Sequence, residues 1–198
     1  NADKEDSLAL YLRAADICRE NIQDYEREHR LLKTCWETGG HEPTLALALL
    51  GCKFSLGLHS EALDMLRSES LTKEAAYPFA ITLKNKCILD NQHALKSKLL
   101  GWAAGVYPDS ILKKEWEIEE YRKKGDSQAL LSVIEGYLED PELSDPKQRS
   151  DAHVEAGQLF HKQLKSEKAL EHYLAAASIG PVAAETLLIA VDLAASTK

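Results

Sequence analysis

The residues from Ser150 to Ala183 constrain the fold of this chain more than any other stretch, because small side chains recur at helical spacing on both sides of a turn. Small residues let two antiparallel helices approach closely, aromatic residues fill the gap between them, and a proline ends the second helix. The residues in these three roles are Ala156, Gly157, Ala169 and Ala176, then Phe160 and Tyr173, and finally Pro181. The stretch therefore predicts a closely packed pair of helices.

The same residues stand at the spacings of a tetratricopeptide (TPR) repeat, and residues 150–183 resemble one such repeat of helix, tight turn and helix. The resemblance implies an all-α fold, a right-handed α-α superhelix or solenoid in which successive helix pairs stack. Three other stretches resemble the repeat more weakly. We therefore expect a TPR-like helical-repeat array over residues 41–198, ending in a terminal helix. The chain has only 10 Gly and 6 Pro, which suits long helices better than a turn-rich β-protein.

The first weaker repeat begins at Pro43, a residue suited to the first turn of a helix. Its turn at Gly57-Leu58-His59 is one residue shorter than the family pattern. The second weaker repeat has apolar positions from Ala75 to Cys87, with Pro78 expected in the first turn of its first helix, and a turn at residues 90–92. Both stretches predict helix pairs that resemble the TPR pattern incompletely.

The third weaker repeat lies between residues 109 and 141. Asp109-Ser110 is expected to cap a helix that ends at a Gly125-Asp126 turn, and the second helix stops before Pro141. The polar residues 139–150 predict a connection, in which Asp145-Pro146 caps and starts the next helix.

The N-terminal residues carry a heptad-like seam, in which apolar positions recur in alternating steps of three and four without proline or glycine. Its members are Leu8, Tyr11, Ala15, Cys18, Ile22, Tyr25, His29, Leu32 and Trp36. We expect one long N-terminal helix within residues 1–40, stopped by Gly39-Gly40. The seam either caps the array by packing against the first repeat helices, which we favour because Ala15, Cys18 and His29 are weak coiled-coil residues, or it forms a coiled-coil homodimer. A break near residues 21–24, giving a helical hairpin, is the third alternative.

The charge of the chain excludes two classes of partner. Lys and Arg total 24 against 32 Asp and Glu, a net charge of -8, so the basic footprint of a protein that binds nucleic acid or an anionic membrane is missing. The balance favours a basic protein partner. The longest apolar run, residues 45–50, is far shorter than the roughly 20 residues of a membrane-spanning helix, so we expect no membrane insertion. Asn1-Ala2 resembles a remnant of tag removal, so we expect a piece of a longer protein.

The sequence contains no HExxH, GxSxG, GxGxxG or GxxxxGK[ST] motif, so we expect no enzymatic activity and no cofactor. His153 and His161 are eight positions apart, and His161 and His172 are expected on different helices of one pair. Because zinc would need at least a third ligand and a pocket, we expect no metal site.

The four cysteines form no CxxC pair, and each lies within an apolar helical pattern. We interpret Cys18, Cys35, Cys52 and Cys87 as buried thiols of a reduced, cytoplasmic protein. A disulfide in a periplasmic protein is the alternative.

The resemblance also implies a binding surface, because the first helix of each TPR repeat lines a concave groove. The positions implied to face this groove are Asp151, Val154, Gln158, His161 and Lys162 in one repeat, and Leu45, Ala48, Cys52, Ser55 and Leu56 in the Pro43 repeat. Such a groove suits an extended or helical peptide held by a few anchors. The Lys, Asn and Arg clamp with which some TPR proteins hold a chaperone C-terminus is absent at the matching positions of the Pro43 repeat and of residues 150–183, although Asn85 could occupy one clamp position in the second weaker repeat.

The residues after Pro181 predict a terminal helix to about Ala195 whose apolar side chains lie on more than one side. We expect either that the array continues beyond this helix in a longer protein, or that this surface packs on another molecule.

The sequence thus predicts a non-enzymatic protein–protein interaction scaffold, a groove-binding TPR-like module of a larger protein. The alternative is a regulatory or oligomerising appendage of an enzyme, for example a transferase, whose catalytic domain lies elsewhere. A homodimer formed through the N-terminal helix is a third hypothesis.

Overall fold

Helix-forming segments separated by short polar turns follow one another along the chain, and the computed structural model describes them over residues 2–38, 43–68 and 71–196. Helices and turns account for all regular structure in these ranges, which confirms the all-α fold. The chain divides into two units, Asn1–Val106 and Tyr107–Lys198. The division predicted at residue 40 stays a prediction. The helices of the first unit are α1 (Ala2–Ile17), the π-helical turn η1 (Cys18–Ile22), α2 (Tyr25–Glu37), α3 (Pro43–Ser55), α4 (His59–Arg67), α5 (Lys73–Leu89) and α6 (His93–Val106).

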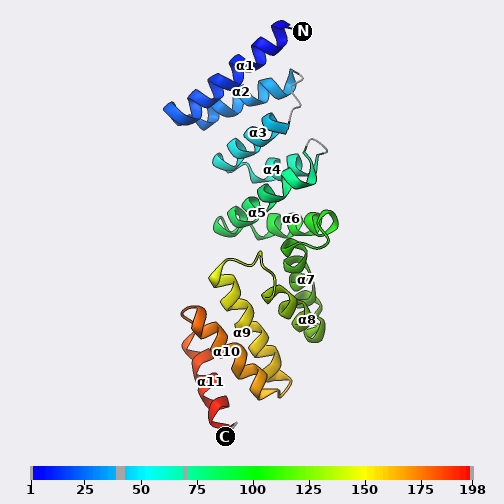
Figure 1. Ribbon diagram of the computed structural model, residues 1–198, viewed down its shortest axis with the longest axis vertical. Coiled ribbons are helices and arrows are strands. Elements are labelled where there is room, and N and C mark those ends of the chain that lie inside the picture. Colours follow the sequence, from blue (N-terminus) through cyan, green and yellow to red (C-terminus); the bar gives the residue numbers. More distant parts are fainter. Residues whose placement is uncertain (1, 39–42, 69–70, 197–198) are drawn as a thin grey trace. The chain divides into compact units, whose positions relative to one another are not determined.

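The predicted single N-terminal helix is wrong, because the chain reverses at Gln23-Asp24 and forms two helices that lie side by side (Figure 1). Gln23 adopts the left-handed conformation with φ of 56°, and the Asp24 amide donates to the Cys18 carbonyl at 3.0 Å. The Asp24 side chain then caps α2 by accepting a hydrogen bond from the Arg27 amide at 2.9 Å. The helical hairpin is therefore the alternative that the structure adopts. The predicted Gly39-Gly40 stop lies outside the described residues.

The N-terminal seam is used inside the first unit rather than in a coiled coil. Ala15 of α1 and Leu32 and Cys35 of α2 share one hydrophobic cluster with Leu45, Leu49 and Cys52 of α3. The continuous helix that a coiled-coil dimer requires is absent from residues 2–38. The favoured interpretation, in which the seam packs against the first repeat helices, is the one the structure shows.

The two weaker repeats of the first unit form the predicted helix pairs α3–α4 and α5–α6. Pro43 begins α3, and Gly57 takes the left-handed conformation (φ 71°) before α4. Pro78 was predicted in the first turn of α5, but it lies inside the helix. The reason is that the Thr72 hydroxyl caps this helix by accepting a hydrogen bond from the Ala75 amide. The helix therefore begins at Lys73, before the apolar positions start.

The second unit contains the third weaker repeat, the well-matched repeat and the terminal helix. Ser110 caps the helix that begins at Ile111 by accepting a hydrogen bond from the Lys113 amide. Asp145 caps the helix that begins at Pro146 by accepting a hydrogen bond from the Lys147 amide. Both caps were predicted. The long helix of the well-matched repeat starts at Pro146, as predicted, four residues before the repeat match begins at Ser150. The helices are α7 (Ile111–Lys124), α8 (Ser127–Leu138), α9 (Pro146–Lys162), α10 (Ser166–Ile179) and α11 (Ala184–Ser196).

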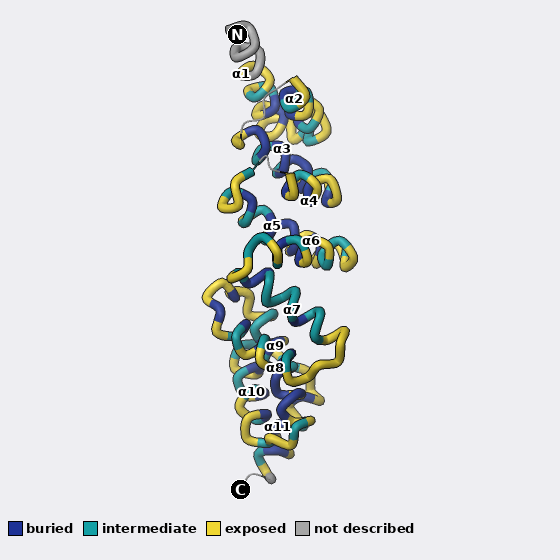
Figure 2. The backbone as a smooth tube through the Cα atoms, turned by 90° about the vertical axis from the view of Figure 1, so that its right-hand side faces the viewer, coloured by how far each residue is buried: buried dark blue, intermediate teal, exposed yellow. Residues whose placement is uncertain are grey.

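The α9–α10 pair forms the centre of the second unit. Ala156, Gly157, Ala169 and Ala176 are all buried, and the Tyr173 side chain fills the space between the two helices with almost no solvent exposure. The predicted use of small residues for close approach is therefore confirmed. Buried residues line the faces along which α8, α9, α10 and α11 meet (Figure 2).

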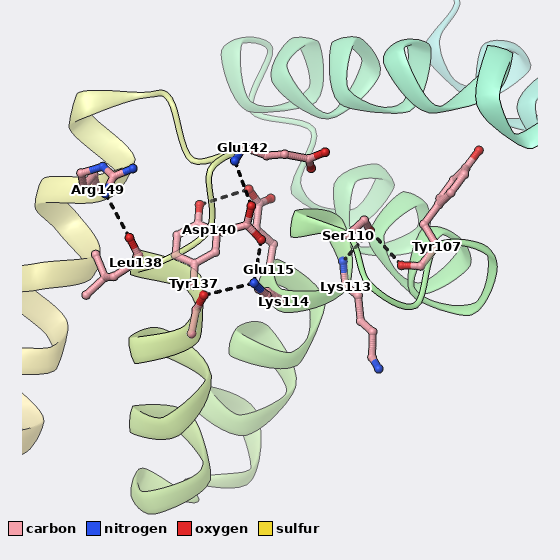
Figure 3. Close-up of polar contacts among 11 residues, drawn as sticks. Tyr107, Ser110, Lys113, Lys114, Glu115, Tyr137, Leu138, Asp140, Glu142 and Arg149 are labelled. Carbon is pink, nitrogen blue, oxygen red and sulfur yellow. Dashed lines mark hydrogen bonds and ion pairs between the residues drawn. The ribbon is translucent and has the colours of Figure 1, made fainter.

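Buried polar contacts fix the connection between α8 and α9 (Figure 3). Asp140 accepts hydrogen bonds from Lys114 Nζ at 2.7 Å and from the Glu142 amide at 2.9 Å, and Lys114 also donates to the Gly136 carbonyl at 3.1 Å. Burial would raise the pKa of Asp140, but the hydrogen bonds from Lys114 and from the Glu142 amide outweigh it and lower the pKa below its ordinary value. The charged form of Asp140 thus holds the first part of the connection.

Arg149, in the second turn of α9, holds the other end of the connection. Its guanidinium donates to the Leu138 carbonyl at 3.0 Å and to the Leu143 carbonyl at 2.6 Å. Because these carbonyls lie at the end of α8 and within the connection, one side chain satisfies backbone groups that the chain reversal leaves unpaired. The predicted connection is therefore an ordered segment with defined contacts.

Two further sequence predictions can be compared with the structure. Cys18, Cys35, Cys52 and Cys87 are all buried free thiols, as predicted. Among the described residues, no helix is both long enough and apolar enough to cross a membrane.

Candidate functional site

An open depression of about 200 Å³ lies on the second unit, where α7, the α7–α8 turn, α8 and α9 come together. Its lining mixes cationic, amide, aromatic and aliphatic side chains. The lining residues are Tyr121, Arg122, Gly125, Ser127, Leu130, Glu155, Gln158, Leu159 and Lys162. We refer to this set as the α7–α9 depression.

The α7–α8 turn gives the depression its shape. Gly125 takes the left-handed conformation (φ 70°). The Gly125 amide donates a hydrogen bond to the Arg122 carbonyl, and the Asp126 amide donates one to the Tyr121 carbonyl, at 3.2 Å each. The Asp126 side chain caps α8 by accepting a hydrogen bond from the Ala129 amide at 3.0 Å. Because the chain reverses within two residues, the start of α8 lies beside the last turn of α7.

A bidentate ion pair joins the first helices of the two repeats across the depression. Arg122 of α7 donates from Nε to Glu155 Oε1 of α9 at 2.7 Å, and a second guanidinium nitrogen contacts Glu155 Oε2. The hydrogen bond to Glu155 raises the pKa of the Arg122 guanidinium, which therefore keeps its charge. Paired hydrogen bonds of this kind fix the orientation of both side chains.

Cationic side chains concentrate around the depression although the chain as a whole is acidic. Lys162, at the end of α9, is exposed and has no ion-pair partner among the described residues. Lys124 Nζ lies 5.5 Å from the centroid of the Tyr121 ring, so the charge sits over an aromatic face at the rim. The arrangement offers charged and hydrogen-bonding groups to a ligand that lies along α9.

Of the predicted groove residues in the well-matched repeat, the structure brings Gln158 and Lys162 together in the depression. Asp151 and His161 are exposed elsewhere on α9, and Val154 is half-buried. The role of these residues in binding stays a prediction.

The predicted groove residues of the Pro43 repeat require a correction. Leu45 and Cys52 are buried in the core of the first unit, and Ala48 and Leu56 pack against the same core. The reason is that the N-terminal hairpin covers this side of α3; the Cys52 thiol even donates to the Tyr25 carbonyl of α2 at 3.2 Å. Ser55 is exposed, and its hydroxyl donates to the Gly51 carbonyl within its own helix.

Sequence reasoning missed Tyr121, Arg122 and Glu155 as members of one site. A signal was present in the run Arg122-Lys123-Lys124, three cations at a helix end in an acidic chain. That Arg122 reaches Glu155, however, depends on how α7 packs beside α9, which local spacing does not determine.

The structure also pairs two histidines that the sequence analysis did not join. His153 Nδ1 of α9 and His172 Nδ1 of α10 lie 3.0 Å apart, so one ring must donate and the other accept. Burial lowers the pKa of both; Arg149 lowers that of His153 further, while Glu135 opposes the shift for His172. The His172 ring also stacks on Phe160, with centroids 5.4 Å apart. Among the described residues, no three side chains of His, Cys, Asp or Glu gather where they could hold a metal ion.

Comparison with known proteins shows the fold. No protein-family model matches the sequence, and no curated protein sequence matches it. Solved structures do match along most of the chain. A double mutant of MamA from Desulfovibrio magneticus RS-1 superposes with a TM-score of 0.55 at 15% identity, covering 88% of this chain and 94% of MamA.

Two further solved structures match this chain to a similar degree. YrrB, a TPR protein with an unusual peptide-binding site, has a TM-score of 0.51 at 18% identity, covering 89% of this chain and 88% of YrrB. PilF of Pseudomonas aeruginosa has a TM-score of 0.52 at 14% identity, covering 98% of this chain and 86% of PilF. The resemblance predicted from residues 150–183 is thus confirmed at the level of the fold.

Proposed function

We propose that this chain, which has the fold of tetratricopeptide-repeat proteins, is a non-enzymatic protein-interaction module that binds an extended acidic peptide along α9. The observation that carries the proposal is the α7–α9 depression, in which Lys162 and Gln158 stand beside the oriented Arg122–Glu155 pair. Of the other exposed groove positions of α9, His161 would extend the contact along the same helix, whereas the Asp151 carboxylate would repel peptide carboxylates placed beside it. The TPR fold supports the proposal, since YrrB has this fold and a peptide-binding site.

The charge of the depression, rather than that of the whole chain, decides the partner. The net charge of -8 favours a basic partner at long range. In physiological salt, however, exposed charges are screened beyond about 8 Å, so the groups within the depression dominate once a peptide is bound. Glu155 is neutralised by Arg122, so that of the two cations that line the depression Lys162 is the one available to a ligand carboxylate.

We also propose a reduced, cytoplasmic setting for this module. The support is that all four cysteines are free and buried in separate helices of one unit. In an oxidising compartment, a chain with four cysteines would more often carry disulfides.

The test is selection from a displayed library of random-sequence peptides, with the whole chain as bait. The affinities of the selected peptides are then measured by isothermal titration calorimetry. We expect peptides enriched in Asp and Glu. Lys162→Glu should weaken their binding by about tenfold, a change of about 1.4 kcal/mol. The matched control is Lys98→Glu, an exposed lysine of α6 in the first unit, which contributes nothing to the depression.

Three results would refute the proposal. Selected peptides without acidic residues would show that the depression does not set the specificity. Equal losses for Lys162→Glu and Lys98→Glu would show a nonspecific charge effect. Selection that enriches no peptide at all would show that this face is not a peptide site.

A further inference from the structure

The terminal helix α11 packs on one side only. Thr186, Ala190 and Leu193 are buried, and α10 is the helix on which α11 rests. On the opposite side, Leu188 is 66% exposed and Val191 is 64% exposed. The sequence-based expectation that this helix is apolar on more than one side is thus confirmed, and exposed residues run along α11 in Figure 2.

Helical spacing defines the exposed surface of α11. Successive residues turn by about 100°, so positions three, four and seven apart share one side. We call this surface the C-terminal face; it consists of Ala184, Leu188, Val191 and Ala195, bordered by the exposed carboxylates Glu185 and Asp192. It is an apolar stripe with negative charge along one edge.

The first helix also exposes apolar side chains, with an arginine between them. α1 packs on α2 through Ala15, which is buried, and Leu12, which is half-buried. Away from α2, Leu10 is 69% exposed and Ile17 is 45% exposed, with the exposed Arg13 between them in the sequence. We call Leu10, Arg13 and Ile17 the N-terminal face.

We propose that the N-terminal face of one copy of this chain docks on the C-terminal face of a second copy. The contact would cover Leu10 and Ile17 of one copy and Leu188 and Val191 of the other, as the helix-on-helix contacts inside each unit cover apolar side chains. It would also place Arg13 beside Glu185 and Asp192, so that the charges at the edge are complementary. This surface is separate from the α7–α9 depression and does not depend on its function.

Pairing of like faces is disfavoured by the same charges. Two C-terminal faces would bring four carboxylates together, from Glu185 and Asp192 of each copy, and two N-terminal faces would oppose two Arg13 guanidinium groups. The contact is therefore head-to-tail, which can add further copies instead of stopping at a dimer. Because each face offers only a few apolar side chains, the association is weak and concentration-dependent.

Sedimentation velocity of the whole chain over a range of concentrations tests this proposal. We expect the average mass to rise with concentration without stopping at the dimer. Leu10→Glu, which blocks the N-terminal face, and Leu188→Lys, which blocks the C-terminal face, should each give monomers. The matched control is Leu164→Lys, because Leu164 is 89% exposed but belongs to neither face; this variant should associate like the parent.

The decisive sample is an equimolar mixture of Leu10→Glu and Leu188→Lys. Each variant keeps one intact face, so a head-to-tail contact predicts that the mixture forms dimers and nothing larger. Circular dichroism should show unchanged helix content, since both leucines are exposed. A reversed pair, Arg13→Glu combined with Asp192→Arg in the same chain, should restore part of the association that Arg13→Glu alone removes.

Four results would overturn the proposal. The parent chain could remain monomeric at every concentration. Leu10→Glu could still self-associate, which would indicate pairing of two C-terminal faces. The mixture could stay monomeric, or Leu164→Lys could lose association as strongly as the two face variants.

Discussion

Gly157 is the residue at which the packing of the second unit makes its sharpest prediction. A methyl group added there would lie 2.7 Å from Cε1, 2.8 Å from Cδ1 and 3.0 Å from Cζ of the Tyr173 ring. Carbon atoms in contact prefer about 3.5–4.0 Å. Since the Tyr173 side chain is almost completely buried, the ring cannot move away into solvent. Gly157→Ala should therefore strain the α9–α10 pair.

Two opposing effects set the magnitude. Alanine is favoured over glycine in a helix by about 1 kcal/mol, whereas overpacking a core costs about 1–3 kcal/mol. We expect Gly157→Ala to lower the free energy of unfolding by up to about 2 kcal/mol, and Gly157→Leu to lower it further. The matched control is Gly136→Ala in α8 of the same unit, where an added methyl group meets no atom within 4 Å. That substitution should stabilise by about 0.5–1 kcal/mol.

Thermal unfolding of the whole chain by far-UV circular dichroism, with hydrogen exchange of the α9 and α10 amides, measures the difference. In a domain of 60–100 residues, 1 kcal/mol corresponds to about 4–8 °C in Tm. Equal stabilisation by Gly157→Ala and Gly136→Ala would refute the reasoning, because the Tyr173 ring could then not occupy the described position. Tyr173→Leu should reduce the difference between glycine and alanine at position 157, since it removes the ring that the methyl group meets.

Three further predictions concern buried ionisable groups. Because burial lowers the pKa of both His153 and His172, the unfolded chain binds more protons, so the Tm should fall as the pH drops below about 6.5, and His172→Gln should reduce this slope. Glu28 is 1% exposed, its Oε2 has no hydrogen-bond partner, and burial raises its pKa. The buried charge destabilises the folded chain at neutral pH and is lost as the pH falls. Glu28→Gln should therefore raise the urea midpoint at neutral pH but not in acid. Asp140→Ala should lower the free energy of unfolding by about 1–3 kcal/mol in urea titrations, because Lys114 and the connection lose a charged acceptor, and no change would contradict the role of this contact.

Much of the fold could be predicted because its turns use residues with special backbone properties. Gly57 and Gly125 occupy left-handed positions, and Ser110 and Asp145 cap helices, so the local sequence marks these boundaries. The reversal at Gln23-Asp24 is marked less clearly, because Asp24 is a capping residue but no glycine or proline stands beside it. A glutamine with φ of 56° is unfavourable locally and is held by the packing of α1 on α2, which only the folded unit provides.

The candidate site was predictable only in part, for a related reason. The resemblance implied Gln158 and Lys162 as groove residues, and both line the α7–α9 depression. Whether a residue on a first helix is open to a partner depends on what covers that helix. Leu45 and Cys52 occupy the corresponding side of α3, but the N-terminal hairpin buries them. No property of residues 43–55 alone indicates that cover.

If the α7–α9 depression binds an acidic peptide as we propose, the Arg122–Glu155 contact affects selectivity, because Glu155 competes within the molecule for the Arg122 guanidinium. An exposed ion pair contributes about 0.2–1 kcal/mol, so a ligand that must displace Glu155 loses about 1.4- to 5-fold in apparent affinity. A peptide with one carboxylate gains little by this exchange. A peptide whose neighbouring carboxylates engage Arg122 and Lys162 together overcomes the competition, so the resident carboxylate acts as a threshold that separates clustered from isolated negative charge.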